Sequence, residues 1–456
     1  MSFYKRSDGK SQPHWKLGAY QLRIPFIHTK LELPEIIQGI VLFAIGLSII
    51  PLLENYAGFS YEAALAVTII FNLMMLIPVL FGVPFVPGMI TPAIPLVIMF
   101  LGDFEGPDAA RALIGLQLTV ALIFLILGIT GLGKTMVTIL PDSLKAGILL
   151  GAGIAAIIGE IEPSGRLATT PISLIIGSIL CFYFMFSKSF QHLHSKNKIA
   201  RMIANFGIMP AIIIAILVGW LSKEYPMPTI EWGFVIPNFT ELWNYTPFVL
   251  GFPSLKTMII AVPTAIIAYI IAYGDIIVGT SMLEVAKEKR KDEKISYSIT
   301  NLHILTFIRN LIHGLFSPQP GLCGPIFTAG TASVLERFKY GRNAMDSVYS
   351  GTFSLILAMT VGSLLLPLVT LFQPVLPIAL SITLIVTGYL CISIGIRQLK
   401  NPTDSGVAGI TAIVLVVYGA AYALVAGVVL YWLLQRKTLW LTKKDSNEEV
   451  ETDKVS

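Results

Sequence analysis

The sequence predicts an all-α membrane protein with about fourteen transmembrane spans, arranged as two inverted seven-span repeats. Three observations predict this class: an apolar composition, a matched pair of broken segments, and the distribution of basic residues among the loops. Of the 456 residues, 55% are hydrophobic and only 13% are charged. The mean hydropathy is +0.76. This composition is typical of an integral membrane protein and excludes a soluble enzyme.

The second observation is a pair of broken segments in equivalent places of two halves. The first, 84–101, reads PFVPGMITPAIPLVIMFL, and the second, 318–338, reads PQPGLCGPIFTAGTASVLERF. Each contains Pro-Gly, three further residues and a second Pro, and matched residues are 233 positions apart (320 − 87 = 233 and 325 − 92 = 233). A membrane tolerates an interrupted backbone only where protein buries it or a cavity lies beside it. Matched interruptions in two halves are the best sequence sign of a transporter binding site.

Each broken segment predicts a short strand followed by an abrupt half-helix. Pro92 and Pro325 come directly after Thr91 and Gly324, which are residues that can cap a helix. Proline is favoured at the first helical position because its missing N–H would have no partner there. We therefore expect the half-helices of spans 3 and 10 to begin at these two prolines.

The other apolar segments complete the expected fourteen spans, and the odd number of spans per half makes the second repeat inverted. The predicted regions are an N-terminal arm (1–35), a first repeat (36–222), an extracytoplasmic loop (223–256), a second repeat (257–435) and a tail (436–456). Besides the broken segments, the spans are expected near 36–53, 62–81, 113–132, 142–158, 171–186, 209–221, 258–286, 302–316, 348–371, 376–396, 407–418 and 421–434.

The third observation is the placement of basic residues. Lys or Arg follows spans 4, 6, 8, 10, 12 and 14, whereas the loops after spans 1, 3 and 7 are acidic or poor in basic residues. Because cytoplasmic loops carry an excess of Lys and Arg, we expect both termini in the cytoplasm, in a bacterial inner or plasma membrane. The net charge of +5 resides in these loops and does not indicate a nucleic-acid partner. Cys181, Cys323 and Cys391 have no disulfide or metal-site spacing and are expected to serve packing.

Asp275 is the carboxylate that we expect to be functional. It stands in the sequence GDIIVGT, well inside span 8, where a carboxylate is expensive and faces a cavity or a partner. We expect it to carry a proton or to bind a coupling Na⁺ ion, together with Gly279, Thr280 and backbone carbonyls. The alternative is a structural hydrogen-bond hub between helices.

Span 9 is polar for a membrane helix, since it carries Asn301, His303, Arg309, Asn310 and His313. Arg309 could pair with an acidic group such as Asp275. The alternative is that this span only faces the protein interior or the aqueous edge. The two histidines are expected to satisfy local hydrogen bonds.

Two half-helix starts that converge near the midplane would form an anion site. Each start presents free N–H groups and about half a positive charge, which suits an anion or a polar solute that bears a carbonyl. Glycines would let a ligand approach the backbone closely. The alternative, that the Pro-Gly pairs only mark loops, does not explain their matched spacing. The expected substrate-binding residues are Gly88, Ile90, Thr91, Gly321, Leu322, Cys323, Gly324, Thr328 and Gln38.

This layout resembles the uracil-permease fold, which is shared by xanthine/uracil permeases, SulP-type anion transporters and bicarbonate or borate carriers. The resemblance covers all the predicted spans, and its motifs are PEIIQG in span 1, PFVPGMITPAIPL in span 3, GDIIVGT in span 8 and PQPGLCGP in span 10. It implies a core domain of spans 1–4 and 8–11 and a gate domain of spans 5–7 and 12–14, with substrate bound between the half-helices and span 8. It also implies that Asp275 is the acidic position of span 8, that 321–324 form the binding segment of span 10, and that the protein is a homodimer.

Two departures separate the chain from branches of this fold. Nucleobase symporters usually carry a glutamate in span 10, which PQPGLCGP lacks. SulP proteins usually end in a regulatory STAS domain, whereas about twenty residues follow the last predicted span here. We therefore expect a secondary active transporter that moves a small anion with Na⁺ or H⁺. No other cofactor is expected, and no enzymatic activity, because the sequence has no catalytic motif. A nucleobase symporter and an anion channel are the alternatives.

Overall fold

The computed structural model describes residues 6–135, 140–163, 165–197, 200, 203 and 209–434. The predicted tail (436–456) and the first five residues of the N-terminal arm lie outside these ranges. The described chain is mainly helical and rich in apolar helices, which confirms the predicted class of an all-α integral membrane protein.

The first half of the described chain contains two short strands in the N-terminal arm, nine α-helices longer than a single turn, and the first broken segment. Its elements are β1 (Trp15–Leu17), β2 (Tyr20–Leu22), α1 (Leu33–Gly46), α2 (Ile49–Ala57), α3 (Tyr61–Leu80), β3 (Gly88–Met89), η1 (Thr91–Ala93), α4 (Ile94–Leu101), α5 (Pro107–Thr130), α7 (Asp142–Ile161), α8 (Arg166–Thr169), α9 (Pro171–Phe186), α10 (Lys188–Lys196) and α12 (Met209–Leu221).

The second half contains the longest helix and the second broken segment. Its elements are α13 (Phe239–Trp243), α14 (Pro247–Leu250), α15 (Leu255–Lys289), α16 (Ile299–Phe316), β4 (Cys323–Gly324), α17 (Thr328–Phe338), α18 (Val348–Leu364), α19 (Leu366–Phe372), η2 (Gln373–Val375), α20 (Leu376–Arg397) and α21 (Pro402–Tyr418), followed by a helix at Ala420–Leu434. Within the described residues, five helices are long and apolar enough to cross a membrane, and six apolar helices are shorter. The count of fourteen spans therefore stays a prediction.

Short polar side chains determine where several long helices begin. The Ser254 hydroxyl accepts a hydrogen bond from the Thr257 N–H (3.1 Å) at the start of α15, and the Ser298 hydroxyl accepts one from the Asn301 N–H (3.2 Å) at the start of α16. Such caps satisfy N–H groups that have no partner within the helix. They fix the ends of the two helices that later contribute Asp275 and Arg309.

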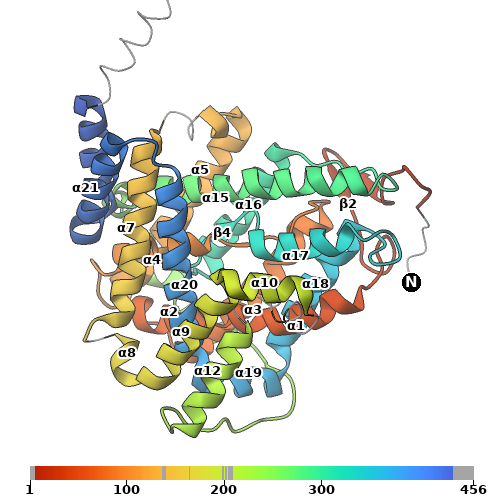
Figure 1. Ribbon diagram of the computed structural model, residues 1–456, viewed down its shortest axis with the longest axis horizontal. Helices are drawn as coiled ribbons and strands as arrows, with labels where there is room; N and C mark the ends of the chain where they lie inside the picture. The colour runs from red at the N-terminus through yellow and green to blue at the C-terminus, as the bar shows by residue number, and fades with distance from the viewer. Residues whose placement is uncertain are drawn as a thin grey trace, which may run out of the picture.

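The helices pack in two groups (Figure 1). In one group α7 packs against α20 and α21, and α9 packs against α12; in the other, α5 packs against α15 and α16, and α18 packs against α1 and α3. Figure 1 shows α7, α20 and α21 running steeply on the left, while α15, α16 and α17 cross the view horizontally. The turn η1 contacts α7 and α20 of the first group and α15 of the second. The broken segments therefore lie where the two groups meet, and the division into gate and core domains stays a prediction.

The two broken segments pair as a two-stranded antiparallel sheet. Strand β3 pairs with β4, and the register places Gly88 opposite Gly324 and Met89 opposite Cys323. The predicted strand plus half-helix is therefore confirmed for both segments. The predicted helix starts are wrong by a few residues: Pro92 lies in η1, and the second half-helix begins at Thr328, three residues after Pro325. The Phe327 N–H donates to the Val86 carbonyl (2.6 Å), and this cross-segment bond keeps the chain extended beyond the proline.

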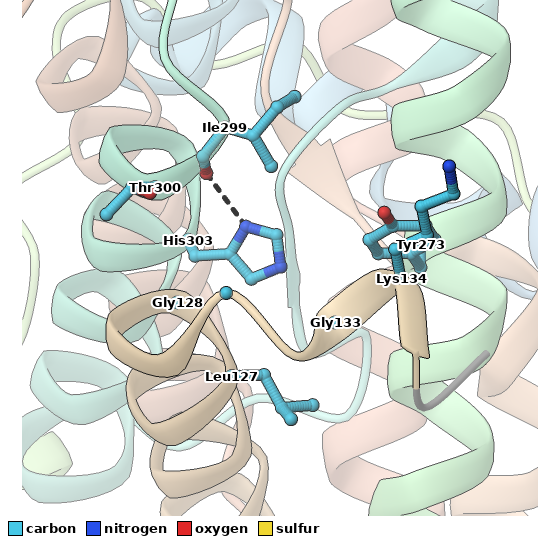
Figure 2. A pocket seen from close by; sticks show the side chains of 9 residues that line it. Leu127, Gly128, Gly133, Lys134, Tyr273, Ile299, Thr300 and His303 are labelled. Carbon is cyan, nitrogen blue, oxygen red and sulfur yellow. Dashed lines mark hydrogen bonds between the residues drawn. The ribbon is translucent and has the colours of Figure 1, made fainter. Parts of the chain in front are cut away.

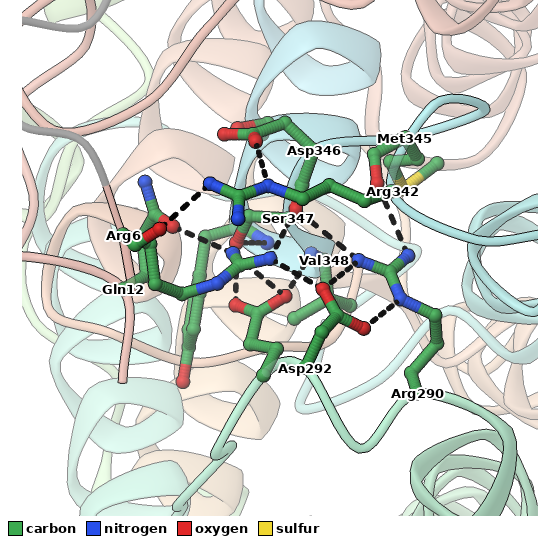
Figure 3. Close-up of polar contacts among 12 residues, drawn as sticks. Arg6, Gln12, Arg290, Asp292, Arg342, Met345, Asp346, Ser347 and Val348 are labelled. Atoms are coloured by element: carbon green, nitrogen blue, oxygen red, sulfur yellow. Dashed lines mark hydrogen bonds and ion pairs between the residues drawn. The ribbon is translucent and has the colours of Figure 1, made fainter. Parts of the chain in front are cut away.

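The N-terminal arm is fastened to the second repeat by a buried ionic cluster (Figure 3). Arg6 contacts the carboxylates of Asp292 (2.8 Å) and Glu293 (3.2 Å), and its guanidinium is fully buried. Arg290, at the end of α15, contacts Asp292 (2.6 Å) and donates to the Phe338 carbonyl (2.7 Å) at the end of α17. The cluster therefore ties the arm to the ends of the helices that carry Asp275 and Thr328.

Candidate substrate-binding site

Glycines allow the two crossing strands to approach closely at the centre of the site. A Cβ atom on Gly88 would lie 2.7 Å from the Phe327 Cβ, and one on Gly324 would lie 3.2 Å from the backbone of Met89. Real Cβ atoms do not reach the first of these distances, so only glycine fits at Gly88. Each half-helix follows its strand within five residues, since α4 begins at Ile94 and α17 begins at Thr328.

Several predicted site residues in these strands use their backbone groups within the protein. The Ile90 N–H donates to the carbonyls of Gly321 (2.9 Å) and Leu322 (3.2 Å). Leu322 is buried and adopts a left-handed φ of 49°, which is rare for a branched side chain. Ile90, Gly321 and Leu322 therefore lie at the crossing of the two strands. The Ile90 N–H already has hydrogen-bond partners there.

Arg309 joins the two strands, which the sequence did not predict. Its Nη1 donates to the Gly324 carbonyl (2.9 Å) and its Nη2 donates to the Gly88 carbonyl (3.1 Å). The side chain comes from α16 and is completely buried. The expected partner was an acidic group such as Asp275. Among the described residues Arg309 has no ion pair, and its guanidinium instead binds one carbonyl from each half of the site.

Two amide side chains support the second strand in the same way. Asn310 donates to the Cys323 carbonyl (2.8 Å) and accepts from the Cys323 N–H (2.9 Å), so it holds both backbone groups of that residue. Gln117 on α5 accepts from the Gln319 N–H (2.9 Å). The only sequence signal for this support was the polarity of span 9, which did not identify the partners.

Asp275 contacts the first residue of the second half-helix. The Thr328 hydroxyl donates to the Asp275 carboxylate at 2.5 Å, across the contact between α15 and α17. Thr328 was expected one turn inside its helix, but it is the first helical residue. The carboxylate therefore lies at the positive end of α17, where an anionic group is favoured. The Asp275 side chain is half-buried, and its charge acts on the buried thiol of Cys391 on α20.

The two residues expected to assist Asp275 have their own packing roles. The Thr280 hydroxyl donates to the Ile276 carbonyl (2.7 Å) within α15. A Cβ on Gly279 would lie 2.8 Å from the Ile326 Cδ1, so this glycine lets the second broken segment pack on α15. Gly279 therefore positions the segment, while the lone pairs of the Thr280 hydroxyl remain available as ligands.

Gln38, Thr91 and Gly321 complete the set of predicted site residues. The Gln38 side chain on α1 accepts from the Ser333 hydroxyl (2.8 Å), five residues beyond the start of α17. Thr91 is half-buried at the start of η1. The Gly321 carbonyl holds the Ile90 N–H, and a Cβ there would meet the Gln319 side chain at 2.8 Å. The structure thus gathers the predicted residues around the strand pair, with Gln38 reaching the side of α17.

Both histidines of α16 make a local hydrogen bond, and the His303 Nε2 also lies 3.0 Å from the Tyr269 hydroxyl on α15. The His303 Nδ1 lies 2.8 Å from the Ile299 carbonyl, and the His313 Nδ1 lies 2.8 Å from the Ser317 carbonyl. Figure 2 shows His303 beside a cavity of about 40 Å³ between the end of α5 and the start of α16. None of the predicted site residues lines this cavity: its lining is Leu127, Gly128, Gly131, Gly133, Lys134, Tyr273, Ile299, Thr300 and His303.

Comparison with known proteins identifies the fold. No family model and no curated protein matches the sequence. The transmembrane domain of the cyanobacterium bicarbonate transporter BicA matches with a TM-score of 0.52 and 15% identity, over 86% of this chain and 96% of that domain. SLC26A9 matches with a TM-score of 0.53 and 14% identity, over 88% of this chain and 64% of its own length. The murine Slc26a9 anion transporter in its inward-facing state matches with a TM-score of 0.54 and 14% identity, over 90% of this chain and 69% of that one.

The match to BicA extends over nearly all of its transmembrane domain, whereas the chain spans just under two thirds of one SLC26A9 chain. At these identities the likeness establishes the fold. All three structures are of transporters, which agrees with the expectation that the chain is not an enzyme. The chain is therefore a multi-pass integral membrane protein with the fold of the SulP/SLC26 transporters.

Proposed function

We propose that this protein is a secondary active transporter that moves a small anion, held between the starts of α4 and α17, with Na⁺ or H⁺ coupled through Asp275. The observation that carries the proposal is Arg309, which binds the Gly88 and Gly324 carbonyls and has no acidic partner among the described residues. An arginine stays protonated in proteins. Arg309 therefore brings a full positive charge to the strand pair without a carboxylate in contact among the described residues.

The electrostatics of the two half-helices adds to this charge. Each helix start carries about half a positive charge, and each start follows one strand of the β3–β4 pair closely along the chain. Helix starts with free N–H groups favour anions. Asp275 opposes them with a single negative charge at the start of α17. A small anion would compensate the positive charge that remains.

The structural neighbours favour the same substrate class. BicA is a bicarbonate transporter and murine Slc26a9 is an anion transporter. The second broken segment, PQPGLCGP, has no carboxylate that could bind the N–H groups of a nucleobase. These points support an inorganic anion or a carboxylate over uracil or xanthine.

The coupling ion would act at the contact between Asp275 and Thr328. If the carboxylate binds Na⁺, it must stay ionised, and uptake should survive at alkaline pH in the presence of Na⁺. If it carries a proton, uptake should collapse when the proton gradient is removed. The cytoplasmic location of both termini and a homodimer are further parts of this proposal.

Binding to the purified full chain tests the proposal. Sulfate, bicarbonate, acetate, uracil and xanthine are screened by thermal shift with and without Na⁺, using wild type, Asp275→Asn and Glu284→Gln. Glu284 is the matched control, since it is an exposed carboxylate on the same helix that pairs with Lys287 (2.9 Å). An anion present at about 100 times its Kd should stabilise the protein by about 2.7 kcal/mol.

Three outcomes distinguish the alternatives. The proposal is supported if an anion stabilises wild type, and if this stabilisation is altered in Asp275→Asn and retained in Glu284→Gln. Stabilisation by uracil or xanthine alone would replace the anion by a nucleobase. Single-channel anion currents that need no coupling ion would identify a channel.

A further inference from the structure

The segment between α12 and α13 contains an extended stretch, 230–236, that is bonded to the break between α18 and α19. The Val235 N–H donates to the Leu364 carbonyl (2.8 Å), and the Leu366 N–H donates to the Gly233 carbonyl (3.1 Å). These bonds form an antiparallel bridge between Phe234 and Leu365. The stretch 230–236 therefore has a fixed orientation relative to 364–366, although it is not part of β1, β2, β3 or β4.

The same bonds explain how the break between the two helices is tolerated. Helix α18 ends at Leu364 and α19 begins at Leu366, so backbone groups at this point lose their helical partners. The extended stretch supplies one donor and one acceptor to them. The Glu231 N–H also donates to the Thr370 hydroxyl (3.2 Å) on α19. The position of the stretch is thus coupled to the position of this break.

One face of the stretch consists of large apolar side chains with no cover. Ile230, Trp232, Phe234 and Ile236 are 51%, 86%, 74% and 88% exposed, whereas Val235 is only 8% exposed. The exposed residues recur with the period of two that places side chains on one face of a strand. The face continues into exposed apolar residues on both sides, namely Leu221, Met227, Phe239 and Trp243.

The backbone of the stretch limits how deep it can lie in a membrane. One edge pairs with 364–366, and the other edge has N–H and C=O groups without a described backbone partner. An open strand edge does not occur in the hydrocarbon region, because its polar groups need water or another partner. Large apolar side chains, by contrast, favour removal from water. Both requirements are met only at the boundary between head groups and acyl chains, where Trp is enriched.

We propose that the stretch 230–236 is an interfacial anchor that inserts the side chains of Ile230, Trp232, Phe234 and Ile236 into the head-group boundary of the bilayer. The partner is a zwitterionic lipid surface. Between 224 and 254 the chain has Glu224, Glu231 and Glu241 and no Lys or Arg, so attraction to anionic head groups does not contribute. The anchor sets the depth of the break between α18 and α19, through its bonds to Leu364 and Leu366.

The test measures the depth of Trp232 in the full-length protein, reconstituted in phosphatidylcholine vesicles. A variant that retains only Trp232, with the other tryptophans changed to Phe, is compared with one that retains only Trp15. Trp15 is the matched control, because it is 47% exposed on the N-terminal hairpin. Nitroxides are placed on the lipid head group, at a shallow acyl position or at a deep acyl position, and iodide is added as the aqueous quencher.

The anchor predicts that Trp232 is quenched most strongly by the head-group and shallow nitroxides, at least twice as strongly as by the deep one, and that iodide quenches it less than Trp15. Quenching by iodide without quenching by any lipid nitroxide would overturn the proposal. Protection from both quenchers would also overturn it and would indicate a second copy of the chain on this face.

A second variant tests the anchor independently, in case the single-Trp proteins misfold. Cys181, Cys323 and Cys391 are buried, so Ile236→Cys in the otherwise unchanged chain can be labelled with an environment-sensitive fluorophore. We expect a blue-shifted emission in phosphatidylcholine vesicles and quenching by the shallow nitroxide. Emission typical of water would contradict the anchor.

Discussion

The two broken segments have the same backbone design but different chemistry. The first half-helix, α4, consists of eight apolar or proline residues, IPLVIMFL. The second, α17, contacts other helices through polar side chains: Thr328 binds Asp275, Ser333 binds Gln38, and Arg337 pairs with Glu35. The first copy therefore provides shape and a helix start, and the second also provides side chains that can respond to a coupling ion. Two segments with the same backbone design thus differ in the side chains that they present.

Arg309 is the one described side chain that binds both copies, so its removal should have the largest effect. Arg309→Met leaves the Gly88 and Gly324 carbonyls buried without this donor, and each unpaired group costs about 1–3 kcal/mol. We expect the free energy of unfolding to fall by roughly 2–6 kcal/mol and anion-dependent stabilisation to disappear.

Arg309→Lys separates the charge from the geometry. Lysine keeps the charge but lacks the planar fork that reaches two acceptors at once. It should retain a measurable preference for anions with a smaller loss of stability than Arg309→Met. Anion binding by Arg309→Met that equals wild type would show that the charge has no part in recognition. Thermal unfolding and anion titration of the three proteins provide both readouts.

Matched threonines at the two half-helices test the difference in chemistry. Thr328→Val removes a hydrogen bond to a carboxylate, which is worth about 1.5–3 kcal/mol, and should weaken coupled uptake by roughly 10- to 100-fold. The structure gives no side-chain hydrogen bond for Thr91 among the described residues, so Thr91→Val should change uptake less than about threefold. Initial uptake rates in proteoliposomes measure both. Equal losses would mean that the two half-helices contribute alike.

Two glycines test whether the first strand is the more tightly packed. In Gly88→Ala the new methyl would meet the Phe327 Cβ at 2.7 Å, and this atom cannot move without the backbone. In Gly321→Ala the closest atom would be the Gln319 Oε1 at 2.8 Å, at the end of a side chain that can rotate, and the Met89 Cβ and Sδ would lie at 3.0 Å. We expect Gly88→Ala to cost about 1–3 kcal/mol of unfolding free energy and Gly321→Ala less. The reverse order in chemical unfolding would contradict this packing.

The sequence predicted the elements of this site better than the contacts between them. Paired Pro-Gly motifs were sufficient to predict two strands with half-helices, because proline and glycine act locally. The start of α17 was wrong, since the bond from Phe327 to Val86 overrides the local preference of Pro325. The matched spacing made Gly88 equivalent to Gly321, yet the register pairs Gly88 with Gly324.

The spacing of residues in the sequence did not predict the contacts between distant helices. Asp275 and Thr328 were both predicted as site residues, but their hydrogen bond depends on how α15 packs against α17. Arg309 was one candidate partner for a carboxylate, and only the packing of α16 against the strands reveals its two carbonyl acceptors. The carboxylate partners of Arg6 lie more than 280 residues away in the sequence, so the ionic cluster could not be predicted.

The far ends of the two half-helices also differ, and pH tests this difference with the smallest expected effect. The end of α17 is held by Arg290, which donates to the Phe338 carbonyl and pairs with Asp292, whereas α4 ends at Leu101 and has no charged residue in its sequence. The hydrogen bond from Arg290 is the main cause that lowers the pKa of Asp292 below its ordinary value of 3.8. The stabilisation from Asp292 is therefore complete above pH 3.8 and is lost as the pH falls through the lower pKa of the folded protein.

Melting temperatures of wild type and Asp292→Asn should differ by about 2 °C at pH 5.5, and the difference should shrink as the pH falls below the ordinary pKa. Glu293 affects stability in a different pH range from Asp292, because burial raises the pKa of Glu293 above the ordinary 4.5. Its effect has the opposite sign: the folded protein retains the proton, so stability decreases as the pH rises from 4.5 toward the raised pKa. A difference between wild type and Asp292→Asn that persisted unchanged to the lowest pH would show that the carboxylate charge does not hold the end of α17.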